Sequence, residues 1–157
     1  MIFYLDSSSL VKRYVAEPGA PLVERALAVA HVAATATISR VEVVAAFAKG
    51  VRFGVTTKED AESARQLFRV EWPHFVRLRV TEAVMERACD FAWMYGLRGY
   101  DSIQLATAAN WQESLDMPVA MATFDRNLWK ASARAGLEPY PPDLLTARGD
   151  EQDGRLG

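Results

Sequence analysis

The sequence is poor in the residues that build disulfides and zinc sites. Its 157 residues include one cysteine, Cys89, and two histidines, His31 and His74. A single cysteine excludes an internal disulfide or a CxxC metal site. Zn²⁺ prefers nitrogen and sulfur ligands, and no local His/Cys cluster is present, so the sequence also disfavours a zinc centre. Any metal site would therefore have to be made of oxygen ligands.

Long apolar runs are also missing. The Ala-rich stretch 27–48 is interrupted by His31, Arg40 and Glu42, and no run reaches the roughly 18 apolar residues that a membrane-spanning helix needs. The N-terminus has no basic region and Asp6 ends its apolar run, which disfavours a secretory signal. We therefore expect one cytoplasmic domain with no membrane contact.

The net charge of −2 does not by itself indicate a nucleic-acid-binding protein. Residues 143–157 hold four acids and two bases, so residues 1–142 carry 20 − 4 = 16 acids and 18 − 2 = 16 bases. This segment is also rich in glycine and charge, which is typical of a poorly ordered tail. We expect a folded domain over 1–142 and a poorly ordered tail over 143–157.

Apolar patterning predicts strands that alternate with helices, which indicates an α/β fold with a parallel sheet and right-handed crossovers. The predicted strands are Ile2–Leu5, Val32–Ile38, Phe75–Val80 and Val119–Thr123. Thr81 is predicted to cap a helix that ends at Gly96. The predicted inward face of that helix consists of Val84, Met85, Ala88, Cys89, Ala92 and Trp93.

Four acidic residues lie where a strand-like run gives way to a helix. They are Asp6, Glu42, Asp101 and Asp125. Each has a structural explanation, because acids in a first helical turn favour the helix dipole, and Ser39-x-x-Glu42 matches a capping box. Capping does not require all four to face one edge of the sheet, however. The edge at which parallel strands end is where such folds bind ligands.

Four carboxylates in one pocket would repel one another unless cations bind between them. Oxygen ligands select Mg²⁺ or Mn²⁺, and such ions can activate a water for attack on a phosphodiester. Excluding these four acids, residues 1–142 carry a surplus of four positive charges, which suits a polyanionic substrate. Ser8 is interpreted as a metal ligand or cap, because no base is placed to make it a nucleophile. Thr123 is expected either to bind a carboxylate or water, or to cap a helix.

Four segments resemble the motif regions of PIN-domain ribonucleases, and especially the VapC-type toxins of type II toxin–antitoxin pairs. They are YLDSSSLVKRYVAEPG, SRVEVVAAFAKG, GLRGYDSIQLATAA and ATFDRNLWKAS. The similarity runs from about Ile2 to Gly136 in the family's order and spacing. LRGYDSIQLATA is the most specific part, whereas LDSS or SRVE alone would be weak.

The resemblance implies a three-layer α/β/α fold, with a central parallel sheet of about four to five strands, and RNA cleavage dependent on Mg²⁺ or Mn²⁺. It implies that Asp6 and Asp101 are the main metal ligands and that Asp125 completes the site. Glu42 would bind a second ion or orient the attacking water. The family also implies an antitoxin that covers the active site, and commonly a homodimer.

Bases near the acids in the sequence are candidate RNA contacts, although solvated helix faces explain them equally well. They are Lys12, Arg13, Arg40, Arg98, Arg126 and Lys130. Trp93, Tyr95 or Trp129 could stack on a base, but their helical spacing favours packing in the core or a dimer.

Two other functions compete with a ribonuclease. A receiver-like signalling module also clusters acids around Mg²⁺, but it would need a pair of acids at the first strand and a lysine near the last strand. Here the first strand carries only Asp6, and Lys130 lies within a predicted helix. A non-catalytic PIN domain that only binds a partner is the third interpretation, and the presence of all four acids counts against it.

Overall fold

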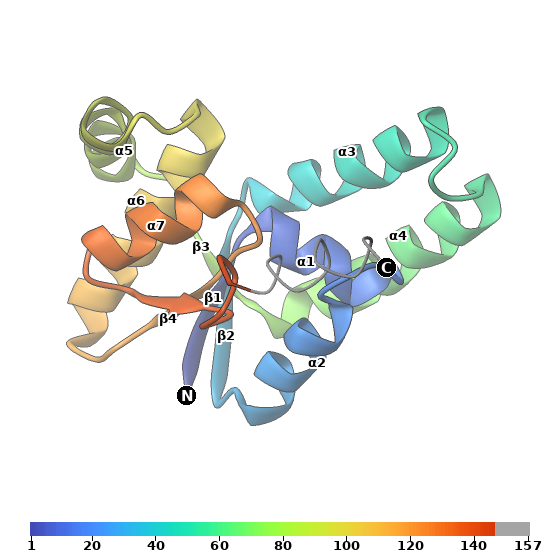
Figure 1. Ribbon diagram of the computed structural model, residues 1–157, viewed down its shortest axis with the longest axis horizontal. Helices are drawn as coiled ribbons and strands as arrows, with labels where there is room; N and C mark the ends of the chain where they lie inside the picture. Colours follow the sequence, from blue (N-terminus) through green and yellow to red (C-terminus); the bar gives the residue numbers. More distant parts are fainter. Residues whose placement is uncertain (147–157) are drawn as a thin grey trace, which may run out of the picture.

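Five parallel strands form the centre of the molecule (Figure 1). The computed structural model describes residues 1–146, and the sheet has the order β3-β2-β1-β4-β5. Every neighbouring pair is parallel. The strands are β1 (Ile2–Leu5), β2 (Val32–Ala36), β3 (Val76–Leu78), β4 (Ala120–Ala122) and β5 (Glu138–Tyr140).

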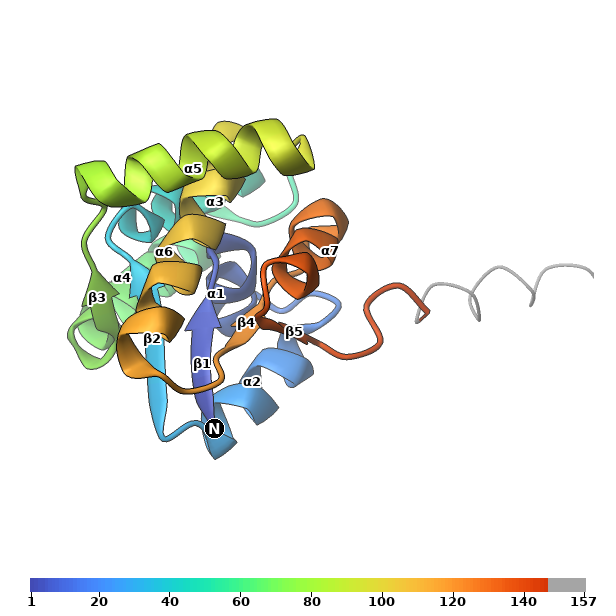
Figure 2. The ribbon, with the colours of Figure 1, turned by 90° about the vertical axis from the view of Figure 1, so that its left-hand side faces the viewer.

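Helices cover both faces of the sheet, which confirms the predicted three-layer α/β/α architecture. Helices α1–α4 pack on one face and α5–α7 on the other (Figure 2). They are α1 (Ser7–Tyr14), α2 (Ala20–Val29), α3 (Ser39–Arg52), α4 (Lys58–Glu71), α5 (Glu82–Tyr95), α6 (Gly99–Leu115) and α7 (Arg126–Arg134), with a 3₁₀ turn at Trp72–His74. No helix within residues 1–146 is long and apolar enough to cross a membrane.

Strand β1 shows how the sequence builds two cores from one sheet. Successive strand side chains point to opposite faces, so Phe3 and Leu5 enter the core under α1–α4, whereas Tyr4 enters the core under α5–α7. All three are buried. Because β1 lies in the middle of the sheet, it has no polar face, and its short apolar run is typical of a buried parallel strand.

Strand β5 was not predicted. No predicted strand covers residues 138–140, yet they pair with β4, and the hydroxyl of Tyr140 donates to the carbonyl of Leu22 at 2.8 Å. A three-residue edge strand that contains proline has no alternation that sequence patterning can detect. Within the predicted tail, residues 143–146 form a turn in which the Thr146 amide donates to Asp143. The tail residues 147–157 lie outside the described part of the chain.

The predicted inward face of α5 is partly wrong. Val84 and Ala88 are buried as expected. The third buried residue of α5 is Phe91, which was not among the residues predicted to face inward. Cys89 is exposed, and Trp93 is 93% exposed. Figure 2 shows that α5 is an outer helix lying across α6. Only Val84, Ala88 and Phe91 of this helix are buried, so the face in contact with the rest of the protein is narrow. The edge strand β3 is shorter than the predicted Phe75–Val80, and its Val76 is 42% exposed.

Phe68 provides a test of the core under α1–α4. It is 2% exposed and makes edge-on contacts with Tyr14, Phe47 and Trp72. We expect Phe68→Ala to lower the free energy of unfolding by about 3–5 kcal/mol, through lost burial and a residual cavity. The matched control is Leu67→Ala on the same helix, where the side chain is 45% exposed. Urea titrations of both variants measure the difference, and equal losses would contradict this packing.

Candidate active site

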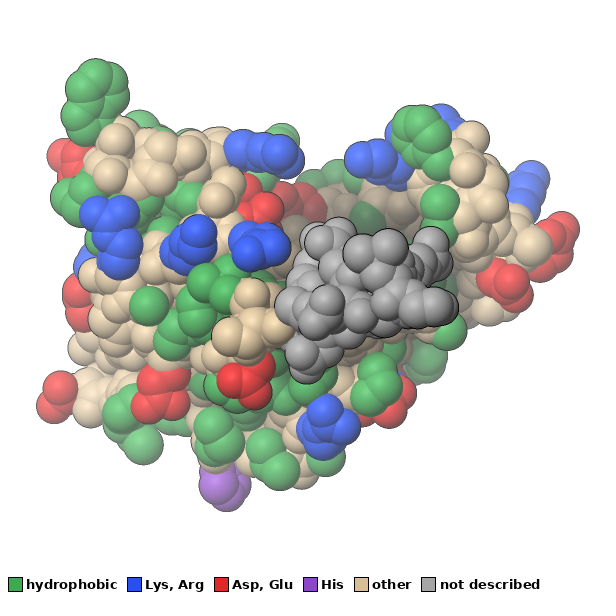
Figure 3. All heavy atoms as spheres, viewed as in Figure 1, with side chains coloured by type: hydrophobic (Ala, Val, Ile, Leu, Met, Phe, Trp, Pro, Cys, Tyr) green, Lys and Arg blue, Asp and Glu red, His purple; other side chains and the backbone are tan. Residues whose placement is uncertain are grey.

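The four predicted site acids lie around the edge at which the parallel strands end. Asp6 and Asp125 follow β1 and β4, Glu42 is in the first turn of α3 after β2, and Asp101 is in the first turn of α6. Figure 3 shows a hollow between the α3–α4 hairpin and the helices α5–α7. Acidic side chains gather in it, and Lys and Arg side chains lie on both sides.

Asp6 is the most buried of the four acids, at 2% exposure. Its carboxylate accepts hydrogen bonds from the Ser8 hydroxyl (2.7 and 2.9 Å), the Ser9 amide (2.9 Å) and the Thr123 hydroxyl (2.7 Å). Burial raises the pKa of Asp6, and these donors oppose that rise because they stabilise the charged form. Asp6 therefore caps α1, as one sequence interpretation held, and also anchors a network that extends beyond this helix.

Ser8 and Thr123 connect the turn after β1 to the turn after β4. Ser8 Oγ accepts from the Phe124 amide at 3.0 Å, and Thr123 Oγ1 accepts from the Asp125 amide at 3.2 Å. The alternative role of Thr123 as a helix cap is wrong, because Asp125 caps α7 by accepting from the Leu128 amide at 2.8 Å. Both hydroxyls instead hold the Asp6 carboxylate between two chain segments.

The pKa of Asp101 depends on the charges of two of the other acids. This side chain is half-buried, and burial together with the charges of Asp125 and Asp6 raises its pKa to about 6. The positive charge of Arg98 opposes the shift. The negative charge of Asp101 in turn helps to raise the pKa of Glu42, after the larger effect of burial. The fold thus brings the four carboxylates into one electrostatic field.

Glu42 does not form the predicted capping box. Helix α3 begins after Ile38, which makes no side-chain cap, and Ser39 is already within the first turn. Glu42 Oε2 instead accepts a 2.7 Å hydrogen bond from Gln104 Nε2. The capping-box explanation of this acid is therefore wrong, although Glu42 does lie in the first turn of α3, and its carboxylate is oriented by α6.

Gln104 is a buried residue that the sequence analysis missed. Its amide nitrogen donates to Glu42 and to Ser39 Oγ (2.9 Å), and its oxygen accepts from the Tyr4 hydroxyl. Thr35 lies 2.8 Å from the same Ser39 oxygen. A signal for Gln104 did exist, because it follows Asp101 by one helical turn and is a lone amide among apolar residues. Such a residue, once buried, needs partners.

The side chains at the site suit a hard divalent cation. Within residues 1–146, no three His, Cys, Asp or Glu side chains are arranged so that they could hold a metal ion together. The donors around the edge are carboxylates and hydroxyls, which Mg²⁺ and Mn²⁺ prefer. The raised pKa of Asp101 also reflects repulsion between like charges, which a cation would relieve.

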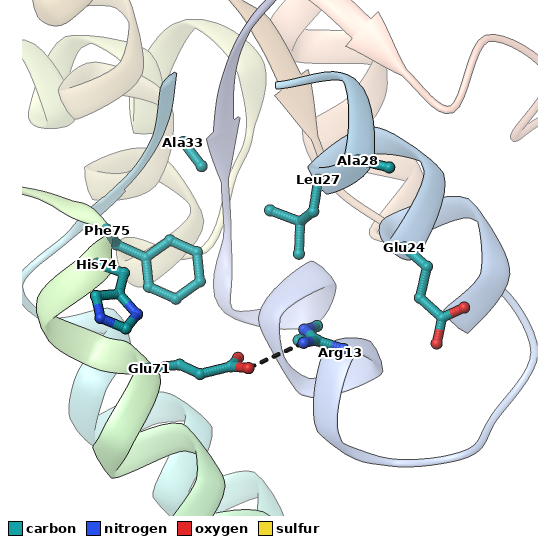
Figure 4. Close-up of a pocket in the computed structure, with 8 residues that line it drawn as sticks. All are labelled: Arg13, Glu24, Leu27, Ala28, Ala33, Glu71, His74 and Phe75. Carbon is teal, nitrogen blue, oxygen red and sulfur yellow. Dashed lines mark hydrogen bonds and ion pairs between the residues drawn. The ribbon is translucent and has the colours of Figure 1, made fainter. Parts of the chain in front are cut away.

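The predicted RNA-contacting bases fall into two groups. Lys12 forms an ion pair with Glu17 at 2.9 Å, and Arg13 forms one with Glu71 at 2.9 Å. Arg13 also lines a cavity of about 400 Å³ together with Ala33 (Figure 4). Ala33 is near the start of β2, so this cavity is at the edge opposite the acids. Lys12 and Arg13 thus have structural partners. The other four predicted RNA-contacting bases are exposed, namely Arg40, Arg98, Arg126 and Lys130.

The three candidate stacking aromatics lie in different environments. Trp93 is almost fully exposed, so packing in the core of the monomer is wrong for it. Tyr95 packs against Phe91 with ring centroids 5.3 Å apart. Trp129 donates from Nε1 to the carbonyl of Pro141 at 2.8 Å, which ties α7 to the segment after β5.

Comparison with known proteins decides the family. The family model described as "PIN domain" matches residues 3–133. The chain belongs to the PIN-domain family. The matched segment of this PIN domain includes the four acids, and its fold agrees with that of solved relatives. PIN-domain VapC nucleases generally depend on a divalent metal ion.

Similar proteins include ribonuclease VapC46 of Mycobacterium tuberculosis. It is 30% identical over 139 residues, which is 88% of this chain and 96% of that protein. The FitAcB crystal structure from Neisseria gonorrhoeae has a TM-score of 0.62 at 18% identity, covering 84% of this chain and 94% of that chain. A toxin–antitoxin complex from Klebsiella pneumoniae has a TM-score of 0.55 at 17% identity, covering 80% and 87%.

The raised pKa of Asp101 gives this PIN domain a characteristic pH dependence. Because its folded-state pKa is about 6, above the ordinary value of 3.8, the group favours the folded state below about pH 4. This contribution is lost as the pH rises through about 6. In metal-free buffer we expect the parent to lose stability between pH 4 and 7 more steeply than Asp101→Asn. Urea unfolding at each pH measures this, and parallel pH profiles would contradict it.

The Gln104 network gives a second prediction. Gln104→Leu removes the side-chain hydrogen-bond partner of Glu42 and Tyr4 and leaves Ser39 bonded only to Thr35, so we expect a loss of about 1–3 kcal/mol of unfolding free energy. In a double-mutant cycle with Tyr4→Phe, the losses should be less than additive because the two groups bond directly. Strictly additive losses would show that this hydrogen bond contributes nothing.

Proposed function

We propose that this PIN domain is a Mg²⁺- or Mn²⁺-dependent endoribonuclease and the toxin of a type II toxin–antitoxin pair, acting in the cytoplasm. The observation that carries the proposal is the field shared by Asp101, Asp6 and Asp125 at the end of the sheet. A group of carboxylates without a nucleophile–base pair suits metal-assisted hydrolysis. Similarity to a protein named a ribonuclease along 88% of the chain supports RNA as the substrate.

Asp6, Asp101 and Asp125 would hold the metal, with Glu42 at a second ion or at the attacking water. When bound, the ion would lower the pKa of a water and stabilise the leaving oxygen of a phosphodiester. The surrounding residues orient these carboxylates. Ser8 and Thr123 hold Asp6 by hydrogen bonds. Gln104 holds Glu42, so neither side chain has to be ordered when substrate arrives.

An antitoxin that covers the acidic hollow is the proposed protein partner. Support comes from fold similarity to the chain of the Klebsiella pneumoniae toxin–antitoxin complex, with 80% of this chain covered. A homodimer remains a prediction from the family resemblance. The receiver-like alternative is less favoured, because it needs a lysine near the last strand, and Lys130 instead lies exposed within α7.

Removing single charges from the acidic group tests the proposal. We expect Asp101→Asn and Asp6→Asn to reduce RNA cleavage by at least about a hundredfold in Mg²⁺ or Mn²⁺. A labelled oligoribonucleotide measures cleavage, and circular dichroism checks that the fold is retained. Asp90→Asn is the control, because Asp90 is an exposed acid on α5. Parental cleavage by Asp101→Asn would show that the site assignment is wrong.

Metal binding has an independent readout in thermal stability. A cation that binds only the folded state adds about 2.7 kcal/mol when its concentration is 100 times its Kd. The parent and Asp90→Asn should therefore melt at a higher temperature with Mg²⁺ or Mn²⁺ than in chelator, and Asp101→Asn should respond less. Identical melting curves for the parent with and without metal would contradict a cation site among these acids.

A further inference from the structure

Helix α7 carries a row of positive charge that starts beside the acidic site. Arg126, Lys130 and Arg134 are four residues apart, and side chains at this spacing share one helix face. All three are exposed, while Leu128 and Ala131 face the core. No acidic residue occurs between Arg126 and Arg134. We call these three bases the α7 basic row.

The α7 basic row is not used for ion pairing. Among residues 1–146, the ion pairs are Lys12–Glu17, Arg13–Glu71, Arg65–Glu62 and Arg87–Glu113, and none includes a residue of the row. Figure 3 shows basic side chains over α7 beside the hollow. The row therefore presents unneutralised charge to a ligand.

The first base of the row is placed against helix stability. The amino-terminal turn of a helix favours acids, and α4 and α5 follow this rule with Glu59 and Glu82. Helix α7 has Arg126 in that turn, directly after its cap Asp125. Arg126 therefore gains nothing from the dipole of α7, although Lys58 occupies the same first position of α4.

The last base of the row is held in place. The guanidinium of Arg134 lies 4.8 Å from the ring centroid of Tyr95, which ends α5. This cation–π contact orders the side chain at the surface without removing its charge. The row thus runs from the edge of the acidic site to the end of α5.

We infer that the α7 basic row is a phosphate track for single-stranded RNA leading away from the cleavage site. The inference rests on the proposed function. Four helical residues advance about 6 Å along the axis, a step similar to the distance between neighbouring phosphates of an extended strand. Three bases in one line match successive phosphates of a single strand. The substrate would need unpaired nucleotides on one side of the cut, and the track would contribute affinity without reading sequence.

The test compares two charge-matched double variants. Lys130→Gln/Arg134→Gln removes two bases of the row and leaves Arg126, which adjoins Asp125, in place. The control, Arg77→Gln/Arg79→Gln, removes two exposed bases. They lie in or directly after β3, the outermost strand on the side of the sheet away from β5. Each pair is introduced into Asp101→Asn, which we expect not to cleave. Binding to single-stranded oligoribonucleotides of several sequences is then measured across salt concentrations with Mg²⁺ present.

The row variant should bind RNA roughly tenfold more weakly at low salt, to a similar extent for every sequence. The slope of log K against log salt should fall by about 1.4, or about 0.7 per lost single-strand phosphate contact. The Arg77→Gln/Arg79→Gln control should keep the RNA affinity and the salt slope of Asp101→Asn. With Asp101 intact, the row variant should raise KM on a long substrate. Substrates shortened on one side of the cut should be cleaved equally poorly by the row variant and the parent.

Each contrary outcome has a distinct meaning. If the parent does not cleave RNA with metal, the proposed function fails, and the salt slopes still test the track by themselves. If the parent cleaves but the row variant keeps its salt slope, the track is wrong although the enzyme is a ribonuclease. Equal loss in the row variant and the control overturns the track, because any two positive charges would then suffice. Loss of binding to a protein partner with RNA binding unchanged overturns it as well.

Discussion

The buried carboxylate of Asp6 is the constraint on which the rest of the site depends. A charge at the end of the central strand is costly unless its oxygens are hydrogen-bonded. The fold meets this requirement with Ser8 and the Ser9 amide from α1 and with Thr123 from the turn after β4. The same bonds fix where α1 and α7 begin relative to the sheet. The position of Asp125, which caps α7, follows from this arrangement.

The second network opposes the repulsion between the acids. Gln104 on α6 holds Glu42 on α3 and is itself held by Tyr4 of β1. Three elements from different parts of the chain are thereby tied together beneath the hollow. Burial, and after it the charges of Asp125 and Asp6, raise the pKa of Asp101, so the charged form of this side chain is disfavoured. This combination of rigid support and unrelieved charge is common at catalytic sites.

Charge on the surface complements charge in the hollow. Residues 1–142 are neutral as a whole, but the bases differ in how far they are free to meet a ligand. Lys12 and Arg13 are close to Asp6 in sequence, yet ion pairs occupy both. Helix α7 begins directly after Asp125, and its three bases form no ion pair with any acid of residues 1–146. A polyanion would thus meet bound cations at the acids and then the bases of α7.

The sequence by itself determined the α/β class and the positions along the chain of four of the five strands, because these depend on local patterns. It also predicted four site acids from motif spacing. It did not reveal β5, whose three residues pair only because β4 lies beside them. Trp93 was assigned to an inward face since its helical spacing could not show how narrow the contact between α5 and α6 is. Only the tertiary structure decided that Glu42 is held by Gln104 rather than by a capping box. The physical reason is that a hydrogen bond between residues 62 positions apart depends on packing, so local sequence can mark Gln104 as a polar residue but cannot identify its partner.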